Sequence, residues 1–161
     1  ELLMGIHGAN PTTLPGLTDY SLMRLTGELG SNIKQWATTK NFVSWLGLAP
    51  GKNQSGKSTK RSKRKSITRA GQIFKQAAQS LLISKQPGLG SFARRIRARR
   101  GAAIAIKATA RKLAELYYKM FAQGMEYVEI GVKKYEEKLK EQQIKYLNKK
   151  ANQLNMQLVQ Y

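Results

Sequence analysis

The stretch AAIAIKATARKLAELYYKMFA, residues Ala102–Ala122, is a long apolar segment, and it decides the fold of this 161-residue chain. Its apolar side chains recur at steps of three and four, which is the period of one face of a helix. Gly101 precedes the segment and Gly124 follows it, and glycine is typical of helix ends. We therefore expect a central core helix here. The side chains expected to line its apolar face are Ile104, Ile106, Ala108, Leu113, Leu116, Tyr117 and Phe121.

Four shorter helices are predicted before it, from capping side chains, helical spacing of apolar residues and Gly or Pro stops. They run from Thr18 to Glu28, from Thr38 or Thr39 to Leu46, from Thr68 to Leu82 and from Ser91 to Arg100. Because no segment has the alternating pattern of a strand, the predicted fold is all-α. The first helix is expected to bury Leu17, Tyr20, Met23, Leu25 and Leu29. Phe42, Trp45 and Phe74 are interpreted as core residues rather than as platforms for nucleobases.

An amphipathic tail helix is predicted from Val132 to the end of the chain. Its stripe consists of Val132, Tyr135, Leu139, Leu147, Ala151, Leu154 and Leu158. A helix of about 28 residues is roughly 42 Å long, more than a small domain can cover. Two arrangements stay open: the helix projects and pairs with a partner, or it folds back across the core. The predicted organisation is a loop at 1–13, a helical domain at 14–124 and the tail at 125–161.

The charge is unevenly distributed along the chain. The net charge is +20, no acidic residue lies between Gly30 and Ala114, and that stretch holds 20 of the 29 lysines and arginines. A long region of one sign costs folding stability unless a polyanion neutralises it. Nucleic acid is the first candidate, because phosphate neutralisation provides much of its affinity. An anionic membrane is the second candidate, but the clear amphipathic helix lies in the neutral tail, and no apolar run reaches the roughly 18 residues of a membrane span.

Missing residue types exclude several kinds of chemistry. The chain has no cysteine, which excludes disulfides, thiolate zinc sites and a cysteine nucleophile. It has one histidine, His7, which argues against a histidine-dependent triad. Since the basic stretch also lacks acids, it cannot by itself hold Mg²⁺ between carboxylates. We therefore expect no metal or cofactor on this chain. Any phosphoryl transfer needs a covalent nucleophile or carboxylates from another domain.

The most unusual segment is the polar loop at residues 51–67, in which glycines and serines alternate with lysines and arginines. A serine hydroxyl among cations suits attack on a phosphodiester, because the cations offset the charge that develops on the phosphate oxygens. A solvated phosphate-binding loop is the alternative. Residues Gly51–Ser58 also match the pattern of a nucleotide-binding P-loop, but no strand precedes them, so we set nucleotide hydrolysis aside.

Five short motifs occur in an order that resembles a known family. They are LPGL at 14–17, WLGLAPG at 45–51, QSG at 54–56, ITRAG at 67–71 and ATARKL at 108–113. This series resembles the C-terminal domain of transposases of the insertion-sequence "one-ten" family, the bridge-RNA-guided recombinases related to Piv-type DNA invertases. The resemblance covers about residues 14–124. The turn at Pro15-Gly16 is also similar to the hairpin of a helix-hairpin-helix module, whose backbone N–H groups bind phosphate.

The resemblance implies a function and a division of labour. In that family an N-terminal RuvC-like domain holds Mg²⁺ with four acidic residues, and a serine of the C-terminal domain becomes linked to DNA. Ser55 occupies the matching position. Because the chain opens with Glu1 rather than Met, we take it as a piece of such a protein that lacks the metal-binding domain and is inactive alone. The resemblance further implies DNA and a structured guide RNA as partners, a homo-oligomer, and a location at the bacterial nucleoid in the cytoplasm.

The candidate site residues combine the serine with the basic positions around it. Ser55 is the candidate nucleophile, and the alternative reading is a non-catalytic helical module that binds DNA or RNA. The nucleic-acid-binding candidates are Gly16, Lys52, Lys57, Lys60, Arg61, Lys63, Arg64, Lys65, Arg69, Arg94, Arg95, Arg97, Arg99 and Arg100.

Overall fold

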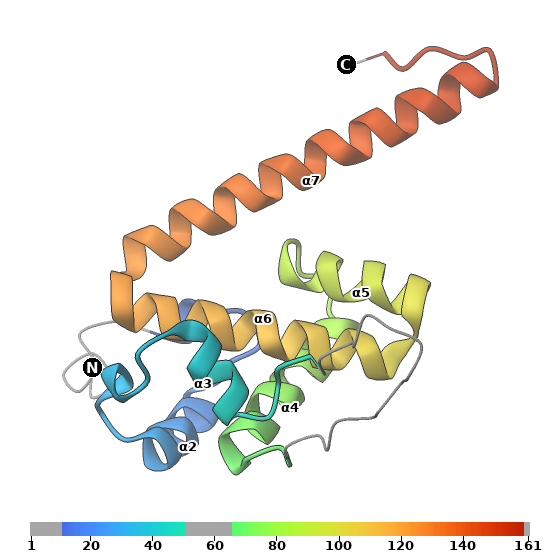
Figure 1. Cartoon of the computed structure of the whole chain (residues 1–161). Helices are drawn as coiled ribbons and strands as arrows, with labels where there is room; N and C mark the ends of the chain where they lie inside the picture. The colour runs from blue at the N-terminus through green and yellow to red at the C-terminus, as the bar shows by residue number, and fades with distance from the viewer. Residues whose placement is uncertain (1–10, 51–65, 160–161) are drawn as a thin grey trace, which may run out of the picture.

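The computed structural model describes residues 11–50 and 66–159, and this part of the chain is helical and contains no strand. The predicted all-α fold is confirmed. The elements are η1 (Pro11–Thr13), α2 (Asp19–Leu29), η2 (Ile33–Gln35), α3 (Thr39–Trp45), α4 (Arg69–Ile83), α5 (Leu89–Arg100), α6 (Ala102–Gln123) and α7 (Met125–Gln153) (Figure 1).

The helix α6 is the centre of the fold, as its sequence predicts. It packs against α4, against α5 near its N-terminal half and against α3 and η2 near its C-terminal half, while α2 packs on α4 (Figure 1). Ile104 is an exception to the predicted stripe, because its side chain is 50% exposed. The buried face instead starts at Ala105 and continues through Thr109 and Leu113 in steps of four, which turns Ile104 towards solvent.

Aromatic rings join three of the helices in the core. Phe42 of α3 lies 6.3 Å from Phe74 of α4, between ring centroids, and 6.4 Å from Tyr117 of α6. Burial raises the pKa of the Tyr117 phenol above its ordinary value of 10.0. The neighbouring Tyr118 hydroxyl donates a hydrogen bond of 2.6 Å to the carbonyl of Trp36, which ties the η2 loop to α6.

Threonine caps begin three helices at the predicted positions. The hydroxyls of Thr18, Thr38 and Thr68 accept hydrogen bonds from the backbone N–H groups of Ser21, Asn41 and Gly71, respectively. Such a bond satisfies one of the N–H groups that a helix start leaves without a partner. The sequence therefore located the starts of α2, α3 and α4 correctly, because each capping threonine acts within its own turn.

The buried side of α2 differs from the prediction. Tyr20 and Met23 were expected in the core but are 70% and 67% exposed, whereas Leu22 is buried. The apolar positions of α2 allow two stripes, and the helix buries the one that includes Leu22, Leu25 and Leu29 against α4. The choice depends on the direction of α4, which the sequence of α2 does not contain.

The start of α5 was also predicted wrongly. The helix begins at Leu89 and its N-cap is Gly88, which has φ of 71°, so Ser91 lies inside the first turn. Leu89 is buried at this point, and its burial favours an earlier start. The Ser91 hydroxyl instead accepts a hydrogen bond of 3.2 Å from Arg94 Nη2.

The tail helix α7 projects beyond the other helices (Figure 1). It begins at Met125, directly after Gly124, rather than at Val132, and it ends at Gln153, so Leu154 and Leu158 lie beyond it. Its middle touches α5, where Glu136 lies beside Gly88. The side chains at 141–150 are all exposed. In this structure the tail does not fold back over the core along its whole length.

Candidate nucleic-acid interface

The candidate nucleophile and all seven basic candidates of the loop lie outside the residues that the structure describes. These are Lys52, Ser55, Lys57, Lys60, Arg61, Lys63, Arg64 and Lys65. The structure does describe both ends of this segment, at Pro50 and Ser66, and it therefore shows where the segment is attached.

The two ends of the segment are attached at one place, the junction between α3 and α4. A Cβ atom on Gly47 would lie only 2.5 Å from the carbonyl oxygen of Ser66. In addition, the Thr68 N–H donates a hydrogen bond of 3.3 Å to the carbonyl of Leu46. The residues that precede and follow the 51–65 segment are thus in direct backbone contact, and the segment leaves and returns at the first turn of α4.

Glycines make this contact possible. Gly47 has φ of 74° and ends α3 in a Schellman motif. In this motif the Gly47 N–H donates a hydrogen bond of 3.1 Å to the Ser44 carbonyl, and the Leu48 N–H donates one of 3.1 Å to the Val43 carbonyl. Gly71, one turn into α4, lies against the Leu46 carbonyl so closely that a Cβ would clash with it. A side chain at either position would force α3 and α4 apart.

Arg69 is the predicted site residue nearest to this junction. It is the first residue of α4, its side chain is 88% exposed, and its Nη1 lies 3.9 Å from Glu28 Oε1 at the end of α2. Such an exposed pair contributes little to stability. The guanidinium of Arg69 therefore remains accessible to a phosphate close to the attachment of the 51–65 segment.

The turn at Gly16 is held against α4. Gly16 has φ of 84°, and a Cβ there would lie 2.9 Å from Leu81 Cγ and 3.0 Å from the carbonyl oxygen of Ala77. At the start of α2, two backbone N–H groups are already bonded within the capping box: that of Thr18 to Ser21 Oγ, at 2.7 Å, and that of Ser21 to Thr18 Oγ1, at 3.3 Å. A phosphate at this helix start would have to use the remaining N–H groups.

The two most N-terminal arginines of α5 have partners within the protein. Arg94 donates hydrogen bonds to the carbonyls of Ser84 and Gln86 at the end of α4. Arg95 reaches α7, where Nη2 lies 3.4 Å from Tyr135 Oη and Nη1 lies 3.5 Å from Gln142 Oε1. The first arginine closes the α4–α5 turn, and the second links α5 to α7.

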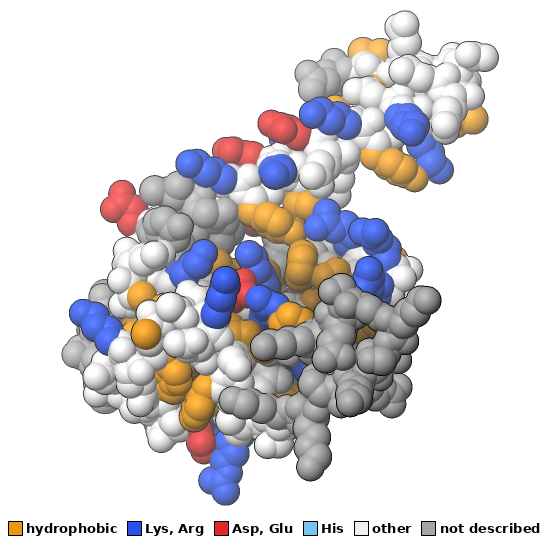
Figure 2. Space-filling model, viewed as in Figure 1, with side chains coloured by type: hydrophobic (Ala, Val, Ile, Leu, Met, Phe, Trp, Pro, Cys, Tyr) orange, Lys and Arg blue, Asp and Glu red, His pale blue; other side chains and the backbone are white. Residues whose placement is uncertain are grey.

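The remaining α5 candidates, Arg97, Arg99 and Arg100, are exposed in its last two turns. Figure 2 shows lysine and arginine side chains gathered over α5 and over the middle of α6, on the same face of the molecule. On α6, Arg111 and Lys112 lie 2.9 Å and 4.0 Å from the carboxylate of Glu115. The candidate list from the sequence omitted this group, although it lies within the same acid-free stretch.

The described residues do not fit a metal centre. Across 11–50 and 66–159, no three His, Asp or Glu side chains come together in a way that could hold an ion. Among these residues there is also no helix long and apolar enough to cross a membrane.

The structure thus defines a basic all-α domain with a long insertion between α3 and α4. The family model described as "Transposase IS116/IS110/IS902 family" matches residues 9–94, just over half of the chain, and the chain belongs to this family. The match includes α2, α3, the 51–65 segment, α4 and the first half of α5. No curated protein and no solved structure matches the chain significantly.

Proposed function

We propose that this chain is the part of a DNA transposase that binds nucleic acid and supplies the serine nucleophile for strand cleavage and exchange. The observation that carries the proposal is the family match over residues 9–94, which spans the basic segment with Ser55. Transposases act on phosphodiester bonds, and a hydroxyl surrounded by lysines and arginines suits this chemistry. Both ends of the segment are attached at the α3–α4 junction, and this common attachment supports the proposal that the segment acts next to the folded domain.

The proposed step exchanges one phosphate ester for another. Ser55 Oγ forms a bond to a backbone phosphorus, the bond from that phosphorus to one deoxyribose oxygen breaks, and the freed oxygen takes up a proton as the serine loses its own. Because the ester is conserved, the hydroxyl of a second strand can reverse the step and complete the exchange. Lys57, Lys60 and Arg61 are the proposed partners of the phosphate oxygens, which carry extra negative charge in the transition state.

The metal-binding carboxylates would come from another domain of the transposase. The described part of this chain offers no group of acids for an ion. We therefore assign no step of the serine chemistry to a metal on this chain, and we expect the chain to bind nucleic acid without cutting it when it is alone.

Further partners follow from the exposed cations. Phosphates of DNA and of a structured guide RNA both attract arginines, so the α5 end at Arg97–Arg100 is proposed to contact either backbone. Further copies of the transposase are proposed as partners of the assembled complex.

A covalent-adduct assay tests the nucleophile. The full transposase, with its guide RNA and a nicked target DNA, should form a protein–DNA adduct that resists denaturation, and Ser55→Ala should abolish the adduct while DNA binding persists. Ser58→Ala, which removes a hydroxyl from the same segment, is the matched control and should keep the adduct. An adduct that survives Ser55→Ala and is lost with Ser58→Ala would move the chemistry to Ser58.

The second candidate function is a non-catalytic module that binds DNA or RNA. The one-sign charge between Gly30 and Ala114 favours it independently of any serine. It predicts tight binding but no adduct with any serine variant. Steep salt dependence does not separate the two functions, because both neutralise phosphates, with an expected loss of about 10³–10⁵ in affinity from 50 to 200 mM salt for 6–10 contacts.

A further inference from the structure

Trp45, at the end of α3, is only half buried, although its sequence context predicted a core residue. Its side chain is 39% exposed, whereas its neighbours Phe42 and Leu46 are fully buried. A large aromatic ring at the surface loses contact with water when another flat apolar group covers it. The exposed face of Trp45 is therefore suited to stacking with a ligand that has an aromatic face.

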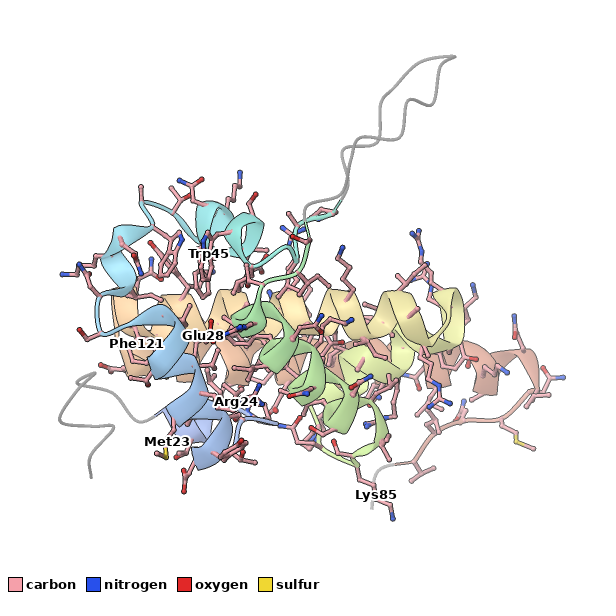
Figure 3. The ribbon with its side chains drawn as sticks, turned by 90° about the horizontal axis from the view of Figure 1, so that it is seen from below. Met23, Arg24, Glu28, Trp45, Lys85 and Phe121 are labelled. Carbon is pink, nitrogen blue, oxygen red and sulfur yellow. The ribbon has the colours of Figure 1, made fainter. Side chains whose placement is uncertain are left out.

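A second tryptophan supports Trp45 from behind. The ring centroids of Trp36 and Trp45 are 5.0 Å apart with 52° between the ring planes, and Trp36 makes an edge contact of 5.0 Å with the buried Phe42. The Trp36 backbone is itself fixed by the hydrogen bond from Tyr118. Figure 3 places Trp45 on the α3 side of the molecule. The exposed indole thus belongs to a cluster of ring contacts that reaches the core, so it is positioned before any ligand arrives.

The charge of the elements that carry the two tryptophans suits a nucleic-acid strand. Lys34 in η2 and Lys40 in α3 are exposed, and no acidic residue occurs in the stretch from 31 to 114 that contains both tryptophans. Asn41 lies one helical turn before Trp45, on the same side of α3, and is exposed. Its amide has both a donor and an acceptor for the edge of a base. The acidic residue of α6, Glu115, forms ion pairs with Arg111 and Lys112.

The position of Trp45 also relates it to the proposed reaction. It lies two residues before Gly47, at the junction where the 51–65 segment is attached.

We propose that Trp45, supported by Trp36 and next to Asn41 on the same face of α3, is a stacking platform for an unpaired nucleobase. The ligand is a single-stranded region of nucleic acid, because the face of a base is free for stacking only outside a duplex. The platform rests on the proposed function for its setting, but it needs no serine chemistry.

The two tryptophans make the platform directly observable, since Trp36 and Trp45 are the only ones in the chain. The full chain is titrated with a short oligothymidylate strand and, separately, with a blunt duplex of equal phosphate content. The single strand should quench the tryptophan fluorescence strongly, and the duplex should quench it weakly. Trp45→Leu should weaken binding of the single strand about tenfold, within the range measured for loss of one stacked base, and leave the duplex affinity unchanged.

Two further variants separate stacking from folding. Trp45→Tyr keeps an aromatic face and should retain most of the single-strand affinity. Tyr146→Leu removes a 59% exposed aromatic ring from α7, far along the chain from the basic stretch, and should change neither affinity. The unfolding midpoint of each variant is measured alongside, so that a loss of binding is compared only among folded proteins.

Three outcomes would overturn the platform. They are an unchanged single-strand affinity in Trp45→Leu, an equal loss for single strand and duplex, and tryptophan quenching that depends on protein concentration without nucleic acid, which would make this face a contact between copies of the chain. Any of these leaves the Ser55 adduct as an independent result. Conversely, failure of the chain to bind any nucleic acid would remove the proposed function together with the platform.

Discussion

The two longest helices, α6 and α7, follow each other directly and begin in the same way but are stabilised differently. Each starts after a glycine with a positive φ, 83° at Gly101 and 90° at Gly124, and neither start has a side-chain cap. The first is covered by α3, α4 and α5, whereas the second contacts only α6 and, near its own middle, the region of α5 (Figure 1). An isolated helix is marginal in water, so α6 depends on packing and α7 on its own sequence and a few contacts.

The difference shows what an apolar stripe can and cannot decide. In α6 the stripe is continuous and meets other helices. In α7 the stripe is sparse, and Ile144 and Leu147 remain 40% and 50% exposed although they are large and apolar. A helical period therefore predicts the helix in both cases, but burial depends on whether another element is within reach.

The largest effect is expected from one pair of leucines. Leu113→Ala, at a fully buried site in α6, should lower the free energy of unfolding by about 2–5 kcal/mol, because it removes apolar contacts and leaves a cavity. Leu147→Ala, at a half-exposed site in α7, should change it by no more than about 0.5 kcal/mol. Urea unfolding of both variants measures the difference. Equal losses would mean that α7 is packed as tightly as α6.

Adjacent arginines extend the comparison to polar contacts. Arg94→Ala removes the hydrogen bonds to the carbonyls of Ser84 and Gln86 in the α4–α5 turn and should destabilise the protein by about 1–3 kcal/mol. Arg95→Ala removes only long, exposed contacts to α7 and should cost less than about 0.5 kcal/mol. Thermal unfolding at fixed salt compares them. A larger loss for Arg95→Ala would show that the attachment of α7 stabilises the body.

Two helical glycines allow the same comparison between a tightly packed position and an open one. At Gly71 a Cβ would clash with the Leu46 carbonyl, so Gly71→Ala should destabilise the protein by about 1–3 kcal/mol. At Gly27 in α2 nothing lies within 4 Å, so Gly27→Ala should stabilise it by about 0.4–1 kcal/mol through the lower entropy of the unfolded chain. Opposite signs in urea unfolding are the expected result. A neutral Gly71→Ala would mean that the α3–α4 junction can widen.

The same distinction explains how much of the fold was predictable. The all-α class, the caps at Thr18, Thr38 and Thr68 and the central helix follow from signals within one turn or one stripe. The exposed side of α2, the start of α5 at Leu89 and the exposure of Trp45 depend on neighbouring helices whose directions the local sequence does not specify. They were therefore predicted wrongly.

The candidate site was also predictable only in part. The acid-free stretch indicated a basic surface, and the structure gathers α5 and α6 cations on one face (Figure 2). Charge alone did not reveal that Arg94 binds the α4–α5 turn and that Arg95 contacts α7, because these contacts depend on how the chain folds back on itself. The predicted role of Ser55 rests on its sequence motif, since it lies outside the described residues.

The burial of Tyr117 in α6 should make the free energy of unfolding depend on pH in the alkaline range. Its folded-state pKa is raised, so its stabilising effect is complete below the unfolded pKa of about 10 and is lost as the pH rises, because the unfolded chain then releases a proton that the folded one keeps. The free energy of unfolding should fall by up to about 1.4 kcal/mol per pH unit above pH 10 from this group. Tyr117→Phe should remove that share of the slope in urea unfolding between pH 9 and pH 11. An unchanged slope would contradict a buried phenol.

The smallest effect is expected when the far part of α7 is removed. A chain that ends at Gln142 keeps Tyr135, Glu136 and Gln142, which lie against α5, and loses only side chains that are mostly exposed. Its free energy of unfolding should therefore differ from that of the full chain by less than about 0.5 kcal/mol. Sedimentation at several concentrations provides the second measurement. If the exposed Ile144 and Leu147 pair with another copy, the full chain should associate and the shortened one should remain monomeric. Loss of stability without any change in association would instead mean that the far half of α7 supports the body.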